Sequence, residues 1–206
     1  MPFEYVDLDI KQEVGWFRFN RPPINAVNLA MLGEMVVAFE ALDLNPKVKV
    51  IVIGSALDRY FNAGADIEAF KQAGSKGMHG WLEQTYRLAR KVRAASKPVL
   101  VAINGIAVGG GLEMSLHADL RFAADDARLG QPEVNIAIIP PVAGTQGLVR
   151  LVGRSNAFRI LYGGELFSAA KALEMGLIDF VLPVARLEKD VQTYAEKLAE
   201  KPANAL

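Results

Sequence analysis

The chain has 206 residues, of which 51% are hydrophobic and 22% are charged, so its composition is that of an ordinary globular protein. It contains no cysteine, which excludes disulfide bonds, thiolate metal sites and a cysteine nucleophile. Its 23 basic and 23 acidic residues balance, and no stretch resembles a membrane span or a signal peptide, so we expect a soluble cytoplasmic protein without nucleic-acid or membrane partners.

The first half of the chain alternates between predicted strands and helices. The assignments follow from a two-residue apolar period for a hairpin, helical spacing of apolar residues, and β-branched runs for buried strands. In chain order we expect a hairpin over residues 5–10 and 15–22, a helix over 29–45, a buried strand over 48–55, a helical segment over 67–73 and, after a flexible break at 74–77, a helix over 81–93.

The second half begins with another buried strand and becomes mostly helical. We expect a strand over 97–103, a helix from the glycines to near His117, a strand over 120–123, helices near 143–151, 155–162, 168–175 and 186–200, and a short strand within 177–182. There is no internal repeat and no interdomain linker. Strands that alternate with helices predict an α/β fold.

Three consecutive glycines stand in "GIAVGGGLE" (residues 105–113), between a predicted strand and a predicted helix. Their spacing differs from the G-x-G-x-x-G loop of dinucleotide sites, and no Walker lysine follows, so a nucleotide loop is not favoured. Bare N–H groups at a helix start can instead stabilise an oxyanion, although close packing of helix on strand would explain the glycines equally well. Glu113 would either face the same cleft or be a solvated helix residue.

A second loop, "FNAGADI" (residues 61–67), has similar properties. Gly64 and Ala65 would let the backbone approach a ligand closely, and Asp66 suits the N-cap of the helix that follows. A plain strand-to-helix turn with a capping residue would account for the same pattern.

Glu133 lies in "LGQPEVNIAIIPP", among apolar and turn-forming residues and without a basic neighbour in sequence. Such surroundings raise the pKa of a carboxyl group and suit it to general acid–base chemistry. The alternative is an exposed glutamate in a turn after proline. His79 and His117 lack metal-ligand spacing, so no metal site is expected.

Several segments together resemble the enoyl-CoA hydratase/isomerase (crotonase) family, in that family's order: "NRPPINAVN", "FNAGADI", "KPVLVAINGIAVGGGLEMSLHADLRFAAD", "ARLGQPEVNIAIIP", "AGTQGLVRLVG" and "SAAKALEMGLIDFVLP". The resemblance covers nearly the whole chain. It implies one domain over residues 1–206, a crotonase-type spiral of repeated ββα units with a helical C-terminal part, assembled as a homotrimer or homohexamer. Family members usually continue with further helices, so we expect a C-terminal helical extension to be missing after Leu206.

The resemblance also implies a lyase that adds water to 2-enoyl-CoA. Its substrate would be an acyl-CoA thioester, with coenzyme A as part of the substrate and no other cofactor. By motif position, the backbone N–H groups of Ala65 and Gly110 would receive the thioester oxygen and stabilise an enolate. Glu113 and Glu133 match the two catalytic glutamates of the family's hydratases, one accepting a proton from water and the other supplying a proton to the α-carbon.

Two segments fall where the family contacts coenzyme A. The first is the strand end formed by Asn25, Ala26 and Val27. The second lies along the adenine and pantetheine parts of the ligand, and would consist of Ala65, Asp66, Ile67 and Glu68.

Pro141 departs from the family pattern, because family hydratases usually have a glycine there whose N–H helps to hold the catalytic water. Proline cannot donate this hydrogen bond, although it could simply occupy the first turn of the next helix. The alternatives are therefore another reaction of the family, namely double-bond isomerisation, thioester hydrolysis or decarboxylation, or an acyl-CoA-binding subunit without turnover.

Overall fold

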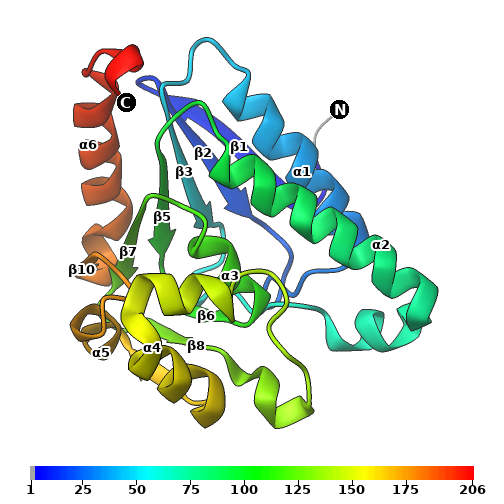
Figure 1. Cartoon of the computed structure of the whole chain (residues 1–206). Helices are drawn as coiled ribbons and strands as arrows, with labels where there is room; N and C mark the ends of the chain where they lie inside the picture. The colour runs from blue at the N-terminus through cyan, green and yellow to red at the C-terminus, as the bar shows by residue number, and fades with distance from the viewer. Residues whose placement is uncertain (1–2) are drawn as a thin grey trace.

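The larger of two β-sheets has six strands and is mostly parallel (Figure 1). The computed structural model describes residues 3–206, apart from the side chains of residues 75 and 76. β1 and β2 form the predicted antiparallel hairpin, and the remaining strands continue in parallel, in the order β1-β2-β3-β5-β7-β10. Their bounds are β1 Val6–Lys11, β2 Val14–Phe19, β3 Val50–Ser55, β5 Val99–Ile103, β7 Leu120–Ala124 and β10 Phe180–Leu182.

The second sheet is built from four strands of three residues each, which the sequence pattern did not predict. Segments so short have no periodicity to detect. In the order β4-β6-β8-β9, they are β4 Tyr60–Asn62, β6 Ile106–Val108, β8 Arg128–Gly130 and β9 Leu166–Ser168. Since β3-β4, β5-β6 and β7-β8 each place one strand in each sheet, the chain winds between the sheets as a spiral of repeated units.

Helices cover both faces of the larger sheet (Figure 1). In β2, a Cβ on Gly15 would lie 3.0 Å from Leu42 of α1, whereas the adjacent Trp16 donates a hydrogen bond of 2.6 Å to Gln192 of α6. Neighbouring residues of a strand point to opposite faces, so α1 and α6 lie on opposite sides of the sheet. The helices are α1 Leu29–Asp43, α2 Ile67–Arg93, α3 Gly110–Ser115, α4 Gln146–Gly163, α5 Ala169–Glu174 and α6 Leu187–Ala199, with 3₁₀ turns η1 Pro132–Ile136, η2 Val184–Arg186 and η3 Ala203–Ala205.

Two glycines mark the helix breaks that the sequence predicts. Gly74 (φ 61°) lies in the break expected at residues 74–77, and it separates two helices within the span α2. The span α4 likewise contains two helices, as expected near 143–151 and 155–162, which meet at a kink at Gly153 (φ 73°). Both residues leave the helical conformation with a positive φ, which glycine adopts without steric cost.

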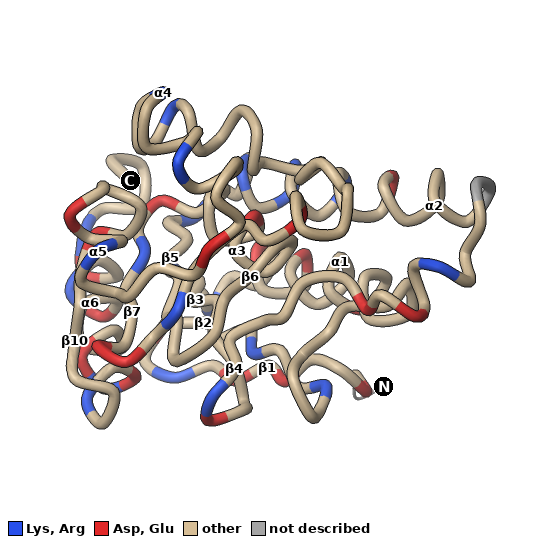
Figure 2. Tube along the Cα trace, turned by 90° about the horizontal axis from the view of Figure 1, so that it is seen from below, with Lys and Arg blue, Asp and Glu red and all other residues tan. Residues whose placement is uncertain are grey.

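Basic and acidic residues are interspersed along the chain, and both kinds occur around α5 and α6 (Figure 2). Within residues 3–206, no helix combines the length and the hydropathy that are needed to cross a membrane.

The contact between α3 and β4 leaves no room for a side chain at Gly111. A Cβ there would lie 2.4 Å from the carbonyl oxygen of Asn62 and 2.7 Å from its Cβ. We expect Gly111→Ala to lower the free energy of unfolding by more than about 2 kcal/mol, because the backbones of two elements must separate. Chemical denaturation followed by circular dichroism measures this loss.

Gly33→Ala is the matched control, since a Cβ at Gly33 in α1 would meet no atom within 4 Å. This variant should stabilise the protein by about 0.5–1 kcal/mol, through helix propensity alone. Equal effects of the two substitutions would contradict the close packing of α3 on β4.

Candidate active site

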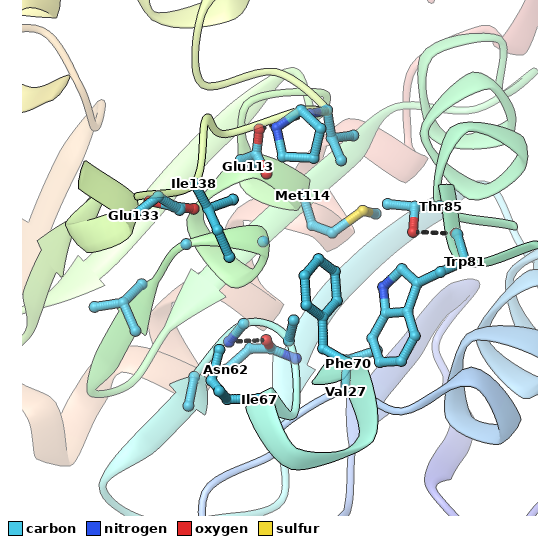
Figure 3. Close-up of a pocket in the computed structure, with 18 of the residues that line it drawn as sticks. Val27, Asn62, Ile67, Phe70, Trp81, Thr85, Glu113, Met114, Glu133 and Ile138 are labelled. Carbon is cyan, nitrogen blue, oxygen red and sulfur yellow. Dashed lines mark hydrogen bonds between the residues drawn. The ribbon is translucent and has the colours of Figure 1, made fainter. Parts of the chain in front are cut away.

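A cavity of about 330 Å³ opens between the turns that follow β4 and β6, helices α1 to α3 and the 3₁₀ turn η1 (Figure 3). Glu113 and Glu133 are the charged side chains of its described wall, and Ile67, Phe70 and Trp81 lie across from them. Most of the remaining wall is apolar, including Val27, Leu32, Met35, Leu82, Met114, Ile136 and Ile138. Two carboxyl groups in an apolar cavity form a site suited to proton transfer.

The turns after β4 and β6 approach each other closely at glycines. A Cβ on Gly64 (φ 78°) would lie 3.0 Å from the carbonyl oxygen of Val108 and 3.1 Å from the nitrogen of Gly110. Within the described residues, neither the Ala65 N–H nor the Gly110 N–H donates a hydrogen bond to the protein. The two predicted oxyanion donors therefore lie on adjacent turns, and their N–H groups are available to a ligand.

The backbone around Ala65 is held by Val27 in a short parallel bridge. The Val27 N–H donates to the Gly64 carbonyl at 2.8 Å, and the Asp66 N–H donates to the Val27 carbonyl at 2.8 Å. These two bonds engage the Gly64 carbonyl and the Asp66 N–H, which lie on either side of the Ala65 N–H, and so fix the orientation of that N–H group. Both Val27 and Ala65 line the cavity.

Glu113 is buried in α3, with 1% of its surface exposed, and does not point to solvent. Its Oε1 accepts three backbone hydrogen bonds, from Val142 at 2.8 Å, Ala143 at 2.7 Å and Gly144 at 2.7 Å. Burial raises the pKa of Glu113, and the three amide donors oppose that shift because they favour the ionised form. The backbone N–H groups of residues 142–144, directly after Pro141, therefore support this carboxylate. The sequence alone did not reveal this role.

Glu133 belongs to η1, where Pro132 occupies the first turn. Burial is the largest cause that raises the pKa of Glu133, to about 7, and the negative charge of Glu113 adds to the shift. Close contact with the glycine turn is possible because a Cβ on Gly109 would lie 3.0 Å from Glu133 Oε1. Glu133 can thus carry a proton near neutral pH.

Gln131 is a site residue that sequence reasoning missed. It is fully buried, and in the amide orientation that satisfies both groups its nitrogen donates to both oxygens of Glu133 at 2.9 Å. The signal in the sequence was its position in "GQPE", two residues before Glu133. A buried amide needs a hydrogen-bond partner, and the nearby carboxylate can be that partner.

Asn25 is fully buried and lies outside the described wall of the cavity, and its contact with coenzyme A stays a prediction. Its Oδ1 accepts from the Arg21 N–H at 2.7 Å, and its Nδ2 donates to Ser55 Oγ at 2.8 Å and to the Phe61 carbonyl at 3.0 Å. Asn25 also has a positive φ of 54°, which asparagine tolerates. It is therefore a structural residue beneath the site, and it holds the segment that carries Val27.

The other predicted substrate-contacting residues divide into two groups. Ile67 lines the cavity, whereas Ala26, Asp66 and Glu68 lie outside its described wall. Asp66 caps α2 by accepting from the Ala69 N–H at 3.2 Å, and it pairs with Arg21 at 3.0 Å. The Ala69 hydrogen bond is the main cause that lowers the pKa of Asp66. The described residues contain no cluster of three or more histidine or acidic side chains able to hold a metal ion.

The sequence matches the family model described as enoyl-CoA hydratase/isomerase over residues 9–206. A probable enoyl-CoA hydratase of Bacillus subtilis is 34% identical over 203 residues, covering 98% of this chain and 78% of the relative. Crotonyl-CoA hydratase of Syntrophomonas wolfei is also 34% identical, over 202 residues, with the same coverage of 98% and 78%. The crystal structure of enoyl-CoA hydratase from Bacillus anthracis superposes with a TM-score of 0.93 at 34% identity, covering 97% of this chain and 78% of the other.

The electrostatics of the two glutamates predict an unusual titration. With ¹³C-labelled glutamate, the Glu133 carboxyl should titrate with a midpoint near 7, because burial and the charge of Glu113 disfavour its ionised form. Glu113→Gln should lower that midpoint by removing the like charge, whereas Glu174→Gln, an exposed ion-paired position in α5, should leave it unchanged. A midpoint near the ordinary value of 4.5 would contradict this environment.

The same shift affects stability. Since the pKa of Glu133 in the folded state lies above its ordinary value of 4.5, ionisation favours unfolding, and stability should fall as the pH rises from about 4.5 to about 7. This contribution should be absent from Glu133→Gln when unfolding is followed across that range.

Proposed function

Because the chain belongs to the enoyl-CoA hydratase/isomerase family, we propose that it adds water across the double bond of 2-enoyl-CoA thioesters, or catalyses the reverse elimination. The observation that carries the proposal is the pair of glutamates on one cavity, with different environments. Glu113 Oε1 accepts three backbone hydrogen bonds, whereas Glu133 has a pKa raised to about 7. Hydration needs one carboxylate that accepts a proton and one carboxylic acid that supplies a proton.

In this proposal, the N–H groups of Ala65 and Gly110 bind the thioester oxygen. Addition of a nucleophile to the β-carbon moves negative charge onto that oxygen, and the two donors stabilise the resulting enolate. Support comes from the close approach of the two glycine turns and from the lack of another acceptor for these amides among the described residues. One such donor is typically worth about 2.7–4 kcal/mol of activation free energy.

The glutamates then divide the proton transfers. Ionised Glu113 accepts a proton from water as the water oxygen bonds to the β-carbon, and protonated Glu133 supplies a proton to the α-carbon of the enolate. The product gains one hydroxyl group and one hydrogen, and proton exchange with solvent restores both glutamates. Three amides favour an ionised Glu113, and burial favours a protonated Glu133, which supports this division of roles.

The apolar part of the cavity supports the proposed substrate class. Leu32, Met35, Phe70 and Trp81 offer a surface for the acyl chain. Coenzyme A would lie along the backbone of residues 65–68 and near Val27, and the proposed reaction needs no cofactor other than the coenzyme A of the substrate.

The assembly, domain and location expected from the sequence belong to the same proposal. We propose one domain over residues 1–206, in a cytoplasmic homotrimer or homohexamer. Large apolar side chains exposed on η1 and the following loop support an assembly, because contiguous exposed apolar surface commonly marks an interface; they include Val134, Ile136 and Ile139.

The glutamate roles can be tested separately. Glu113→Gln and Glu133→Gln should each lower kcat for crotonyl-CoA hydration by about 10²–10⁴, since each removes one proton-transfer group. The measurement is the loss of the conjugated-enoyl absorbance, and binding of the CoA ester, measured by calorimetry, should be retained. Glu174→Gln serves as the control. If Glu113→Gln keeps full activity, the chemistry needs only one carboxylate, and an isomerase is the better assignment.

Pro141 permits a second test, because its nitrogen has no proton to donate to the attacking water. Pro141→Ala and Pro141→Gly return an N–H at this position on the cavity wall, so each should raise kcat for hydration by about three- to tenfold. Pro140→Ala returns an N–H to the preceding peptide and should give no gain. Unchanged hydration in both Pro141 variants would mean that the water is held by the glutamates alone.

A further inference from the structure

We propose that Tyr86 is a positioning residue for Glu113 and acts through the peptide that joins Pro141 to Val142. The inference rests on the proposed function, because it assigns Tyr86 a role in the proton transfer made by Glu113. Tyr86 lies in α2, and its hydroxyl donates to the Pro141 carbonyl oxygen at 3.1 Å.

One peptide unit links the two hydrogen bonds. The Pro141 carbonyl accepts from Tyr86, and the N–H of the same peptide, contributed by Val142, donates to Glu113 Oε1 at 2.8 Å. A donor on the carbonyl polarises the amide and makes its N–H a stronger donor. Tyr86 therefore strengthens one of the three bonds that favour the ionised form of Glu113.

The double proline makes this tether important. Pro140 and Pro141 have no N–H, so neither can anchor the chain by donating a backbone hydrogen bond. In the part of the chain that the structure describes, the Tyr86 bond is the only hydrogen bond made by residues 139–141. The nearest anchors are the Ile138 N–H, which donates to the Glu133 carbonyl at 3.0 Å, and the Val142 N–H on Glu113. Tyr86 thus fixes the segment immediately before the amides that hold the carboxylate.

Tyr86 acts from outside the cavity wall, although its neighbour Thr85 lines it. Its removal should therefore change the chemical step more than substrate binding. The titratable side chain that faces Glu113 from the described cavity wall is Glu133, in η1; Tyr86 in α2 and His117 after α3 lie outside that wall. A change in the Glu113 titration can consequently be separated from Glu133 by following both signals.

Tyr86→Phe tests the proposal, because it removes only the hydroxyl. We expect kcat for crotonyl-CoA hydration to fall about three- to tenfold, the equivalent of one hydrogen bond, while KM changes less than twofold. Tyr162→Phe is the matched control: Tyr162 is 72% exposed and stacks on Phe158 in α4, and its loss should change neither constant. Equal kcat values for wild type and Tyr86→Phe would overturn the proposal, as would an effect confined to KM.

A titration that does not depend on enzymatic turnover tests this inference separately from the proposed function. In ¹³C titrations of labelled glutamate, Tyr86→Phe should move the Glu113 midpoint upward and Tyr162→Phe should not, because a weaker amide donor stabilises the carboxylate less. If wild type does not hydrate crotonyl-CoA, the proposed function fails, but the titration still decides whether Tyr86 acts on Glu113. An unchanged Glu113 midpoint in a folded Tyr86→Phe protein would overturn the inference.

Discussion

The site depends on the close approach of two glycine turns, one from each of two successive β-strand pairs. Because β3-β4 and β5-β6 both cross from the larger sheet to the smaller one, the turns after β4 and β6 reach the same place. There a Cβ on Gly64 would lie 3.1 Å from the Gly110 nitrogen, so the contact exists only between backbones. The helix that begins at Gly110 carries Glu113, and the segment after Ala65 begins α2. This one backbone contact therefore determines where the two amide donors lie and where the helices that wall the cavity begin.

The two glutamates illustrate how a fold separates the chemistry of identical side chains. Burial raises the pKa of both, which by itself favours the protonated form of each. Glu113 receives three backbone donors, and Glu133 receives the amide of Gln131 together with the unfavourable charge of Glu113. The difference lies in how many donors each carboxylate accepts. A pair with one proton between them is the arrangement that acid–base addition to a double bond requires.

The sequence predicts the larger sheet and the α1 region, because buried strands and helical spacing are local signals. Its periodicity does not predict the smaller sheet, whose strands have three residues each, but it does predict the helix breaks at Gly74 and near Gly153. The hydrogen bonds by which the Asn25 side chain supports the backbone of its own segment and of Phe61 are likewise visible only in the structure. The support of Glu113 depends on residues 29–31 positions away, so it is visible only after folding.

The donors that hold Glu113 are backbone groups, and this changes what mutation can do to them. Every residue except proline supplies an N–H, so substitutions at Val142 or Ala143 alter the side chain while leaving the donor in place. Gly144 is more restricted, because a Cβ there would lie 2.3 Å from the ring of Pro140. The contact with Glu113 is thus determined by the path of the backbone. The side chains of this loop can therefore change during evolution while the same three N–H groups still stabilise the carboxylate.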